Sequence, residues 1–430
     1  MKNKILYCLG IILATLFSCK NEGKKDSIPV IKSPGDLREW ILNETIKDYD
    51  RSQFGYDLKF IRQRKTPILL YDTKFKNMVL ISPEFQGRVL TSTAEGLNGY
   101  SFGWLNYDLI GSEEYKDHMN AYGGEDRFWV GPEGGQFSYY FKPKAEFTFD
   151  NWQVPLEFDS QKFEVVSIGA EQASFFKRLI LPNYSGQTMD IVLSRQISLL
   201  SPAAFLYKHG VTMNDKIKAV GFQSLNIIRN NGENEWNRET GMPSVWILGM
   251  FKPSPTVTII LPYKSGPEKT MGPAVNDEYF GKIPDDRILI DPQVVFFKAD
   301  GRKRGKIGVN TFRAKSVAGS FDEERGVLTI IEYSKTDTAS DYVNSMWKIQ
   351  DKPFAGDVVN AYNDGPLENG TQMGPFYELE SSSPAAYLKH DEKLEHVHST
   401  LHFMGDDASL NEISTKILGV SIQQIRNAFK

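Results

Sequence analysis

Short runs of β-branched and aromatic residues, each bounded by turn residues, recur along most of the chain and predict strands. No strand–helix alternation of the kind that builds a parallel sheet accompanies them. Their spacing is typical of β-sandwiches, so we expect an all-β fold with antiparallel sheets. The runs are 68–71, 78–82, 88–92, 163–168, 189–197, 244–250, 257–261, 326–333 and 394–404.

Helical patterns are confined to the two ends of the predicted domain. Leu37, Trp40 and Ile41 recur at helical spacing and predict one short N-terminal helix. Near the C-terminus, Ser409 and Ser421 each stand three residues before an acid or amide, a spacing typical of a capped helix start. Two short closing helices are therefore predicted. No repeat or linker follows Pro34, which favours one domain over residues 35–430.

The N-terminus has the pattern of a lipoprotein signal peptide over residues 1–18. Lys2 and Lys4 precede an apolar run, 5–17, that is shorter than the roughly 20 residues of a membrane span. The run ends in a sequence that resembles a lipobox, which predicts cleavage before Cys19 and lipidation of that cysteine. The alternative is a plain secretory signal. The tract 20–27 is polar and predicts a tether, which we assign to residues 19–34 together with the lipidated cysteine. We therefore expect a domain anchored in the cell envelope outside the cytoplasm, on the periplasmic face or at the cell surface.

Composition narrows the classes of chemistry. The chain has 430 residues, a formal net charge of −4 and two cysteines, of which Cys8 lies in the segment predicted to be removed. The folded domain is therefore expected to lack a disulfide, a cysteine nucleophile and a thiolate metal site. The absence of a basic stripe argues against a nucleic-acid partner, and the basic run 302–304 reads as a solvated turn.

The densest group of polar and aromatic residues among glycines lies at 120–136. Glycine lets the backbone approach a ligand, an indole stacks on a sugar ring, and carboxylates and guanidinium groups bind hydroxyls. Sugar binding is one interpretation. The other is a structural loop in which Asp126 and Arg127 pair with neighbours. The candidate sugar contacts are Tyr122, Glu125, Asp126, Arg127, Trp129 and Glu133.

A second group lies at 376–380, where polar and apolar residues alternate. This alternation places Glu378 and Glu380 on the same face of a predicted strand. Buried together, the two carboxylates would raise one pKa and produce a general acid or base. Two solvated glutamates on an outer face are the more common cause of such a pattern, and the sequence alone favours that explanation.

Three of the six histidines, His396, His398 and His402, share one face of the predicted strand 394–404. Histidines so arranged can ligate zinc, but the pattern supplies no fourth ligand. A single histidine acting as acid, base or hydroxyl partner is favoured, and His398 is the candidate. No metal or cofactor is assigned.

Several separated segments resemble the galactose mutarotase (aldose 1-epimerase) superfamily. Residues 82–90 look like its early strand, which carries Gly-x-Arg in the superfamily and Gly87-Arg88 here. Residues 120–124 look like its Asn-x-His-Gly-Gly loop, with Tyr122 in the histidine position, and residues 379–403 look like its closing region. The chain is more similar still to a family of bacterial lipoproteins with this architecture and no assigned activity. The resemblance implies a large antiparallel β-supersandwich with a sugar site on its concave face.

By this resemblance Glu380 corresponds to the general base of the mutarotases, whereas Asn226 lies in the stretch where they carry a histidine acid. Asparagine does not shuttle protons near neutral pH, so simple mutarotation is in doubt.

The leading hypothesis is a carbohydrate-active protein in which Glu380 is the base and further residues bind hydroxyls in the same pocket. The alternatives are a non-catalytic surface glycan-binding lipoprotein and a metal-dependent lyase or hydrolase that uses His396, His398 and His402. In the leading hypothesis, the side chains that bind sugar hydroxyls are Arg88, Glu125, Arg127 and Asn226. Trp246 is expected in the core, and 360–365 as a polar loop.

Overall fold

The computed structural model describes residue 40 and residues 47–336, 340–367 and 369–430. The predicted signal peptide, Cys19, the tether and, apart from Trp40, the N-terminal helix lie outside the described residues and stay predictions. Thr45–Lys430 form one compact unit. Within the described part of the chain, every helix is too short or too polar to cross a bilayer.

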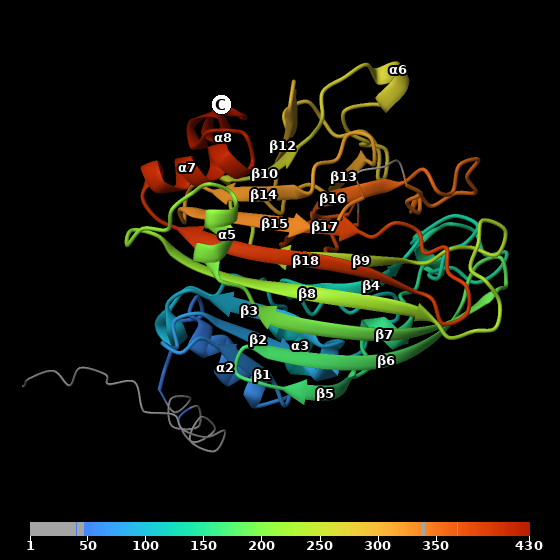
Figure 1. The fold of residues 1–430 in the computed structure, drawn as a ribbon, viewed down its shortest axis with the longest axis horizontal. Coiled ribbons are helices and arrows are strands. Elements are labelled where there is room, and N and C mark those ends of the chain that lie inside the picture. Colours follow the sequence, from blue (N-terminus) through green and yellow to red (C-terminus); the bar gives the residue numbers. More distant parts are fainter. Residues whose placement is uncertain (1–39, 41–46, 337–339, 368) are drawn as a thin grey trace, which may run out of the picture. The chain divides into compact units, whose positions relative to one another are not determined.

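One sheet of ten strands dominates this unit (Figure 1). All of its neighbouring strands pair antiparallel, as the runs of β-branched residues predict. In spatial order its strands are β11 (Ile288–Asp291), β12 (Val294–Lys298), β10 (Val257–Pro262), β14 (Val317–Asp322), β15 (Val327–Tyr333), β18 (Lys393–Met404), β8 (Lys218–Asn230), β7 (Thr188–Leu199), β6 (Gln172–Pro182) and β5 (Glu164–Ile168).

A sheet of five strands and a sheet of three complete the β structure. The five-stranded sheet has the order β13 (Gly305–Asn310), β16 (Asp357–Asn363), β17 (Tyr377–Ser382), β9 (Ser244–Phe251) and β4 (Arg127–Gly131). The three-stranded sheet consists of β1 (Ile68–Tyr71), β2 (Met78–Ser82) and β3 (Arg88–Thr93). The expected polar loop at 360–365 is wrong, because residues 360–363 belong to β16, where pairing with β13 and β17 satisfies the backbone.

Short helices surround the sheets: α2 (Phe54–Arg62), α3 (Tyr107–Ser112), α4 (Leu156–Asp159), α5 (Pro202–Lys208), α6 (Glu268–Met271), α7 (Asp407–Ile417) and α8 (Ile422–Asn427). Three single 3₁₀ turns occupy Pro83–Phe85, Gly96–Asn98 and Phe149–Asn151. The two closing helices are confirmed, and Ser421 caps α8 in the predicted capping box. Ser409 is not the cap of α7, because the Asp406 carboxylate accepts the backbone N–H of Ser409 at 2.9 Å and starts the helix earlier.

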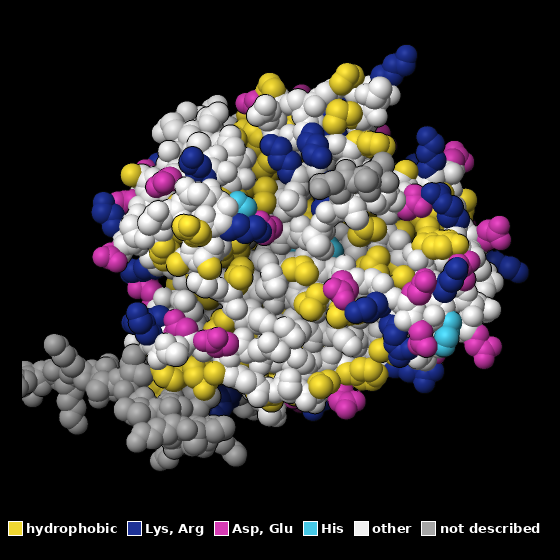
Figure 2. Space-filling model, in the orientation of Figure 1, with side chains coloured by type: hydrophobic (Ala, Val, Ile, Leu, Met, Phe, Trp, Pro, Cys, Tyr) yellow, Lys and Arg dark blue, Asp and Glu magenta, His cyan; other side chains and the backbone are white. Residues whose placement is uncertain are grey.

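The core lies on both faces of the large sheet. Apolar side chains of β10, β12, β14 and β15 pack on one face against the five-stranded sheet. On the opposite face, side chains of β8, β14, β15 and β18 pack against α5, α7 and α8, which lie together over one end of the sheet in Figure 1. Fully burying each such side chain contributes about 1.5–3 kcal/mol. On the face shown in Figure 2, charged side chains of both signs are interspersed. The fold is mostly β, built from large antiparallel sheets with short terminal helices, as predicted.

Candidate functional site

Strand β17 places its side chains alternately on the two faces of the five-stranded sheet. Ser381 contacts the large sheet through hydrogen bonds to histidines of β18. Glu378 and Glu380 therefore share the opposite face, as the alternation predicts. Solvation, the explanation that the sequence favours for this pair, is wrong: Glu378 is 6% exposed and Glu380 0%. Neighbouring strands cover both carboxylates with aromatic and basic side chains.

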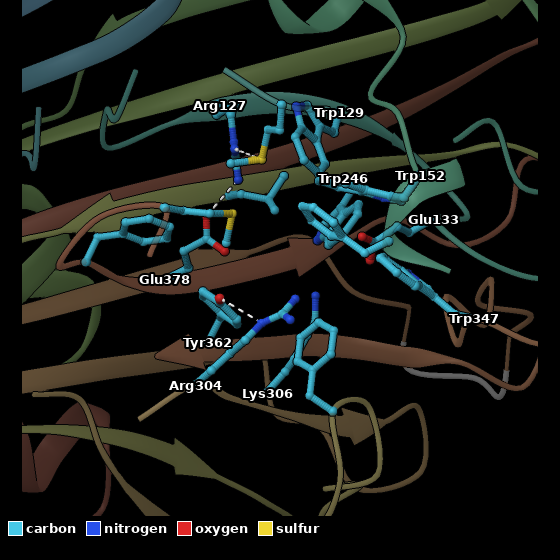
Figure 3. Close-up of a pocket in the computed structure, with 16 residues that line it drawn as sticks. Arg127, Trp129, Glu133, Trp152, Trp246, Arg304, Lys306, Trp347, Tyr362 and Glu378 are labelled. Atoms are coloured by element: carbon cyan, nitrogen blue, oxygen red, sulfur yellow. Dashed lines mark hydrogen bonds and ion pairs between the residues drawn. The ribbon is translucent and has the colours of Figure 1, made fainter. Parts of the chain in front are cut away.

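Four tryptophans gather over this face and form the walls of a cavity. In the registers of β4, β9 and β17, Arg127 and Glu380 both lie opposite Leu248, and Trp129 lies opposite Trp246. Two further indoles come from segments outside the sheets (Figure 3). The volume of the cavity is about 50 Å³. This tryptophan cavity is lined by Met119, Arg127, Trp129, Glu133, Phe149, Trp152, Trp246, Leu248, Phe280, Arg304, Lys306, Trp347, Tyr362, Met373, Phe376 and Glu378.

Two ion pairs lie at the cavity. The Arg127 guanidinium donates from Nη2 to Glu378 Oε1 at 2.6 Å and lies 4.2 Å from the centre of the Trp129 ring. Glu380 Oε2 accepts from Lys306 Nζ at 3.0 Å and from the Trp246 indole N–H at 2.9 Å. Glu380 thus lies directly behind two lining side chains rather than on the wall itself. Each charge has a partner, which offsets part of the cost of burial.

Burial changes the acidity of the two carboxyl groups that line the cavity. It raises the pKa of Glu378 to about 8, because desolvation outweighs the attraction of Arg127 and the charge of Glu380 adds to the rise. Desolvation also raises the pKa of Glu133, against the opposing effect of Lys306. A carboxyl group that keeps its proton near neutral pH can donate it to a bound oxygen. Both groups are therefore candidates for acid–base chemistry.

Arg302 and Lys303 lie exposed in a turn, as predicted for the basic run, whereas Arg304 is half-buried and lines the cavity. Its Nε donates to the Tyr362 hydroxyl at 3.2 Å, and the guanidinium lies 3.9 Å from the centre of the Phe280 ring. Neither contact neutralises its charge. Among the described residues, Arg304 has no carboxylate within ion-pair distance.

A second group of buried charges lies between the sheets. The Arg195 guanidinium of β7 forms an ion pair with Asp126 and donates from Nη1 to the Asn226 side-chain oxygen at 2.5 Å. Ser224 donates to the second Asp126 oxygen at 2.7 Å. All four side chains are at most 1% exposed. Their hydrogen bonds point to a structural role, which matches the alternative interpretation in which Asp126 and Arg127 pair with neighbours.

The structure separates the residues that the sequence analysis grouped into one pocket. Arg127, Trp129, Glu133 and Glu378 line the tryptophan cavity, and Glu380 contacts it through Trp246 and Lys306. The others do not line it. Arg88 donates to the Gly123 carbonyl at 2.9 Å, Tyr122 stacks on Phe85, and Glu125 bonds to Ser92 and His402. Asp126 and Asn226 bind Arg195, and His398 bonds to Ser381. Strand alternation sends Arg127 and Asp126 to opposite sides of the sheet.

The three histidines of β18 share a face, and five of their six ring nitrogens bond to protein groups, whereas Nε2 of His398 is buried without a hydrogen-bond partner. Ser381 Oγ lies 2.8 Å from both His396 Nε2 and His398 Nδ1. His402 bonds to Glu125 through Nε2 and to Thr329 through Nδ1. In the part of the chain that the structure describes, no group of three or more His, Cys, Asp or Glu side chains is placed to hold a metal ion.

The buried histidines predict a loss of stability in acid. Burial lowers the pKa of His396 to about 3 and that of His398 to about 4, whereas an unfolded histidine titrates near 6.5. Between those values only the unfolded chain binds the protons, so stability is full above pH 6.5 and falls as the pH drops. Each histidine contributes a slope of up to about 1.4 kcal/mol per pH unit. We expect His398→Asn to flatten the curve of unfolding free energy against pH between 4 and 6.5, measured by urea denaturation. A variant with an unchanged slope would contradict this assignment.

Comparison with known proteins assigns the chain to a family. Residues 52–429 match the family described as "Family of unknown function (DUF6786)". The chain belongs to this family. No curated protein matches the chain.

Three solved structures are similar to the chain at low identity. The Slr1438 protein from Synechocystis sp. PCC 6803 is 12% identical, with a TM-score of 0.47 over 83% of this chain and 99% of that chain. A galactose mutarotase related enzyme from Lactobacillus acidophilus is 8% identical, with a TM-score of 0.43 over 80% and 99%. A galactose mutarotase-like protein from Lactobacillus casei ATCC 334 is 9% identical, with a TM-score of 0.42 over 79% and 100%.

Sequence reasoning missed most of the tryptophan cavity. Trp152 and Trp347 lie outside the regular strands, where no periodicity marks them. Lys306 reaches Glu380 from β13, which is a neighbour of β17 only through β16. Trp246 is buried in the core, as expected, and also lines the cavity. The sequence feature that could have indicated this cavity is its tryptophans, because four of the seven tryptophans in the chain line it.

Proposed function

We propose that the tryptophan cavity binds a carbohydrate and performs acid–base chemistry on it. The observation that carries this proposal is the meeting of four indole rings with a buried guanidinium–carboxyl pair in one cavity. Indole faces stack on the C–H faces of sugar rings, while paired charged groups bind hydroxyls with defined geometry.

Within this proposal Glu378 exchanges the proton. It is on the cavity wall, and its pKa of about 8 keeps most molecules protonated at pH 7. The carboxyl group would give its proton to a sugar oxygen and take it back from the product, while Arg127 stabilises the intervening carboxylate. The resemblance to mutarotases instead implies Glu380 as the base. Because Glu380 accepts from Lys306 and Trp246, we assign it to positioning those two side chains.

Removing one indole should weaken glycan binding. Trp347 is half-buried and its ring centre lies 5.7 Å from that of Trp152, so its loss should leave the sheet intact. We expect Trp347→Ala to lower affinity about three- to tenfold, as the loss of one aromatic contact does. The measurement is isothermal titration calorimetry against a panel of mono- and oligosaccharides. Tyr207→Ala, which removes an aromatic ring that is 83% exposed elsewhere, is the matched control. Wild-type protein that binds no member of the panel saturably would refute the proposed function.

A further inference from the structure

Two wider hollows continue from the tryptophan cavity. The first, here called the middle basin, has a volume of about 430 Å³ and shares Met119 and Met373 with the cavity. The second, the outer basin, has a volume of about 780 Å³ and shares Asn106, Asp108, Gln372 and Met373 with the middle basin. Met373 therefore lines all three spaces. We call this row of adjoining hollows the groove, and a single sugar would fill only part of it.

The outer basin repeats the chemistry of the cavity in a more open form. Trp104, Tyr100 and Tyr107 line it together with basic side chains. The guanidinium of Arg51 lies 4.4 Å from the centre of the Tyr107 ring. Aromatic rings beside hydrogen-bonding groups are the surface that further sugar units would need. The groove thus offers stacking surfaces at both of its ends.

The groove carries cations beyond those held in ion pairs. Seven lysines and arginines line its three parts, and four of them, Lys116, Arg127, Lys306 and Arg325, are paired with carboxylates. Three of the cations, Arg51, Lys252 and Arg304, have no carboxylate within ion-pair distance among the described residues. The raised pKa values of Glu133 and Glu378 remove part of the opposing negative charge. Such a groove attracts anions.

We propose that the groove binds an acidic oligosaccharide several units long, whose anionic groups contact Arg304 in the cavity and Arg51 and Lys252 in the outer basin. This inference rests on the proposed function and specifies its substrate class. A guanidinium fork matches the two oxygens of a carboxylate or a sulfate, so uronic acids and sulfate esters share the required chemistry.

The test is calorimetric titration of the full chain with chain-length series of one to six sugar units. One arm uses oligouronides beside their carboxyl-reduced forms, and the other uses sulfated oligosaccharides beside their desulfated forms. We expect affinity to rise with length and the neutral counterparts to bind at least tenfold more weakly. Tighter binding in one arm identifies the anionic group. Affinity should also fall as salt rises, because exposed charges are screened.

Variants of single side chains identify which cations contact the anionic groups of the oligosaccharide. We expect Arg304→Gln and Arg51→Gln each to lower affinity for the acidic series about tenfold, and Arg302→Gln, an exposed neighbour on the Arg304 turn, to leave it unchanged. Equal affinity for acidic and neutral forms, or for one unit and six, would overturn this inference and leave the sugar site standing. If no glycan of either kind bound, both this inference and the proposed function would fall. Arg51 lies in the outer basin, so its variant tests the proposal independently of cavity folding.

Discussion

Glu378→Gln should lower turnover of the glycan substrate at least 100-fold while its affinity changes less than about threefold. The amide keeps the size of the side chain and can still accept from Arg127, but it has no acidic proton to give. General acid–base groups contribute about 10²- to 10⁴-fold to rate. The measurement is kcat and the dissociation constant on the glycan that binds best. Wild-type turnover should also fall as the pH rises through about 8, where Glu378 loses its proton.

Glu380→Gln is the matched comparison two residues along the same strand. It removes the charge facing Lys306 but keeps an acceptor for Trp246, so we expect a smaller rate loss and a lower melting temperature. The reverse order, with Glu380→Gln inactive and Glu378→Gln active, would return the general base to Glu380, as the mutarotase resemblance implies. If the wild-type protein bound glycan without turnover, and both variants kept that binding, the protein would be a non-catalytic glycan-binding protein.

Asp126→Ala should destabilise the domain by about 3–5 kcal/mol. The substitution leaves the Arg195 guanidinium charged and buried between the sheets, with Asn226 as its remaining side-chain partner. Urea denaturation at pH 7 measures the change in unfolding free energy. Glu395→Ala is the control, because its pair with Lys393 is about half exposed and should contribute at most about 1 kcal/mol. If the two variants lost equal stability, the buried pair would not be the structural element described above.

The strands were predictable because they depend on local patterns. Alternation in β17 placed Glu378 and Glu380 on one face from sequence alone, and the same logic put the three histidines of β18 on one face. The burial of those carboxylates was not predictable. It depends on which distant segments cover the face, and the strand pairing that brings in Lys306 and Trp246 joins residues more than 70 positions away.

The loop at 120–136 shows the same limit of prediction from sequence. Its composition marks it as a candidate site, yet neighbouring residues of the loop face different parts of the structure. Asp126 turns inward to Arg195, while Arg127, the first residue of β4, turns to the tryptophan cavity. Composition cannot distinguish these directions, because the side of the sheet is set by register with β9. Trp152 and Trp347 belong to irregular segments and have no pattern that predicts their meeting.

The most direct test of a carbohydrate site is a crystal structure of the Glu378→Gln protein with the glycan that binds best. We expect a sugar ring to lie against the indoles of the tryptophan cavity, with its hydroxyls bonded to Arg127 and to the side chain at position 378. A glycan bound elsewhere on the domain, with the tryptophan cavity empty, would contradict it.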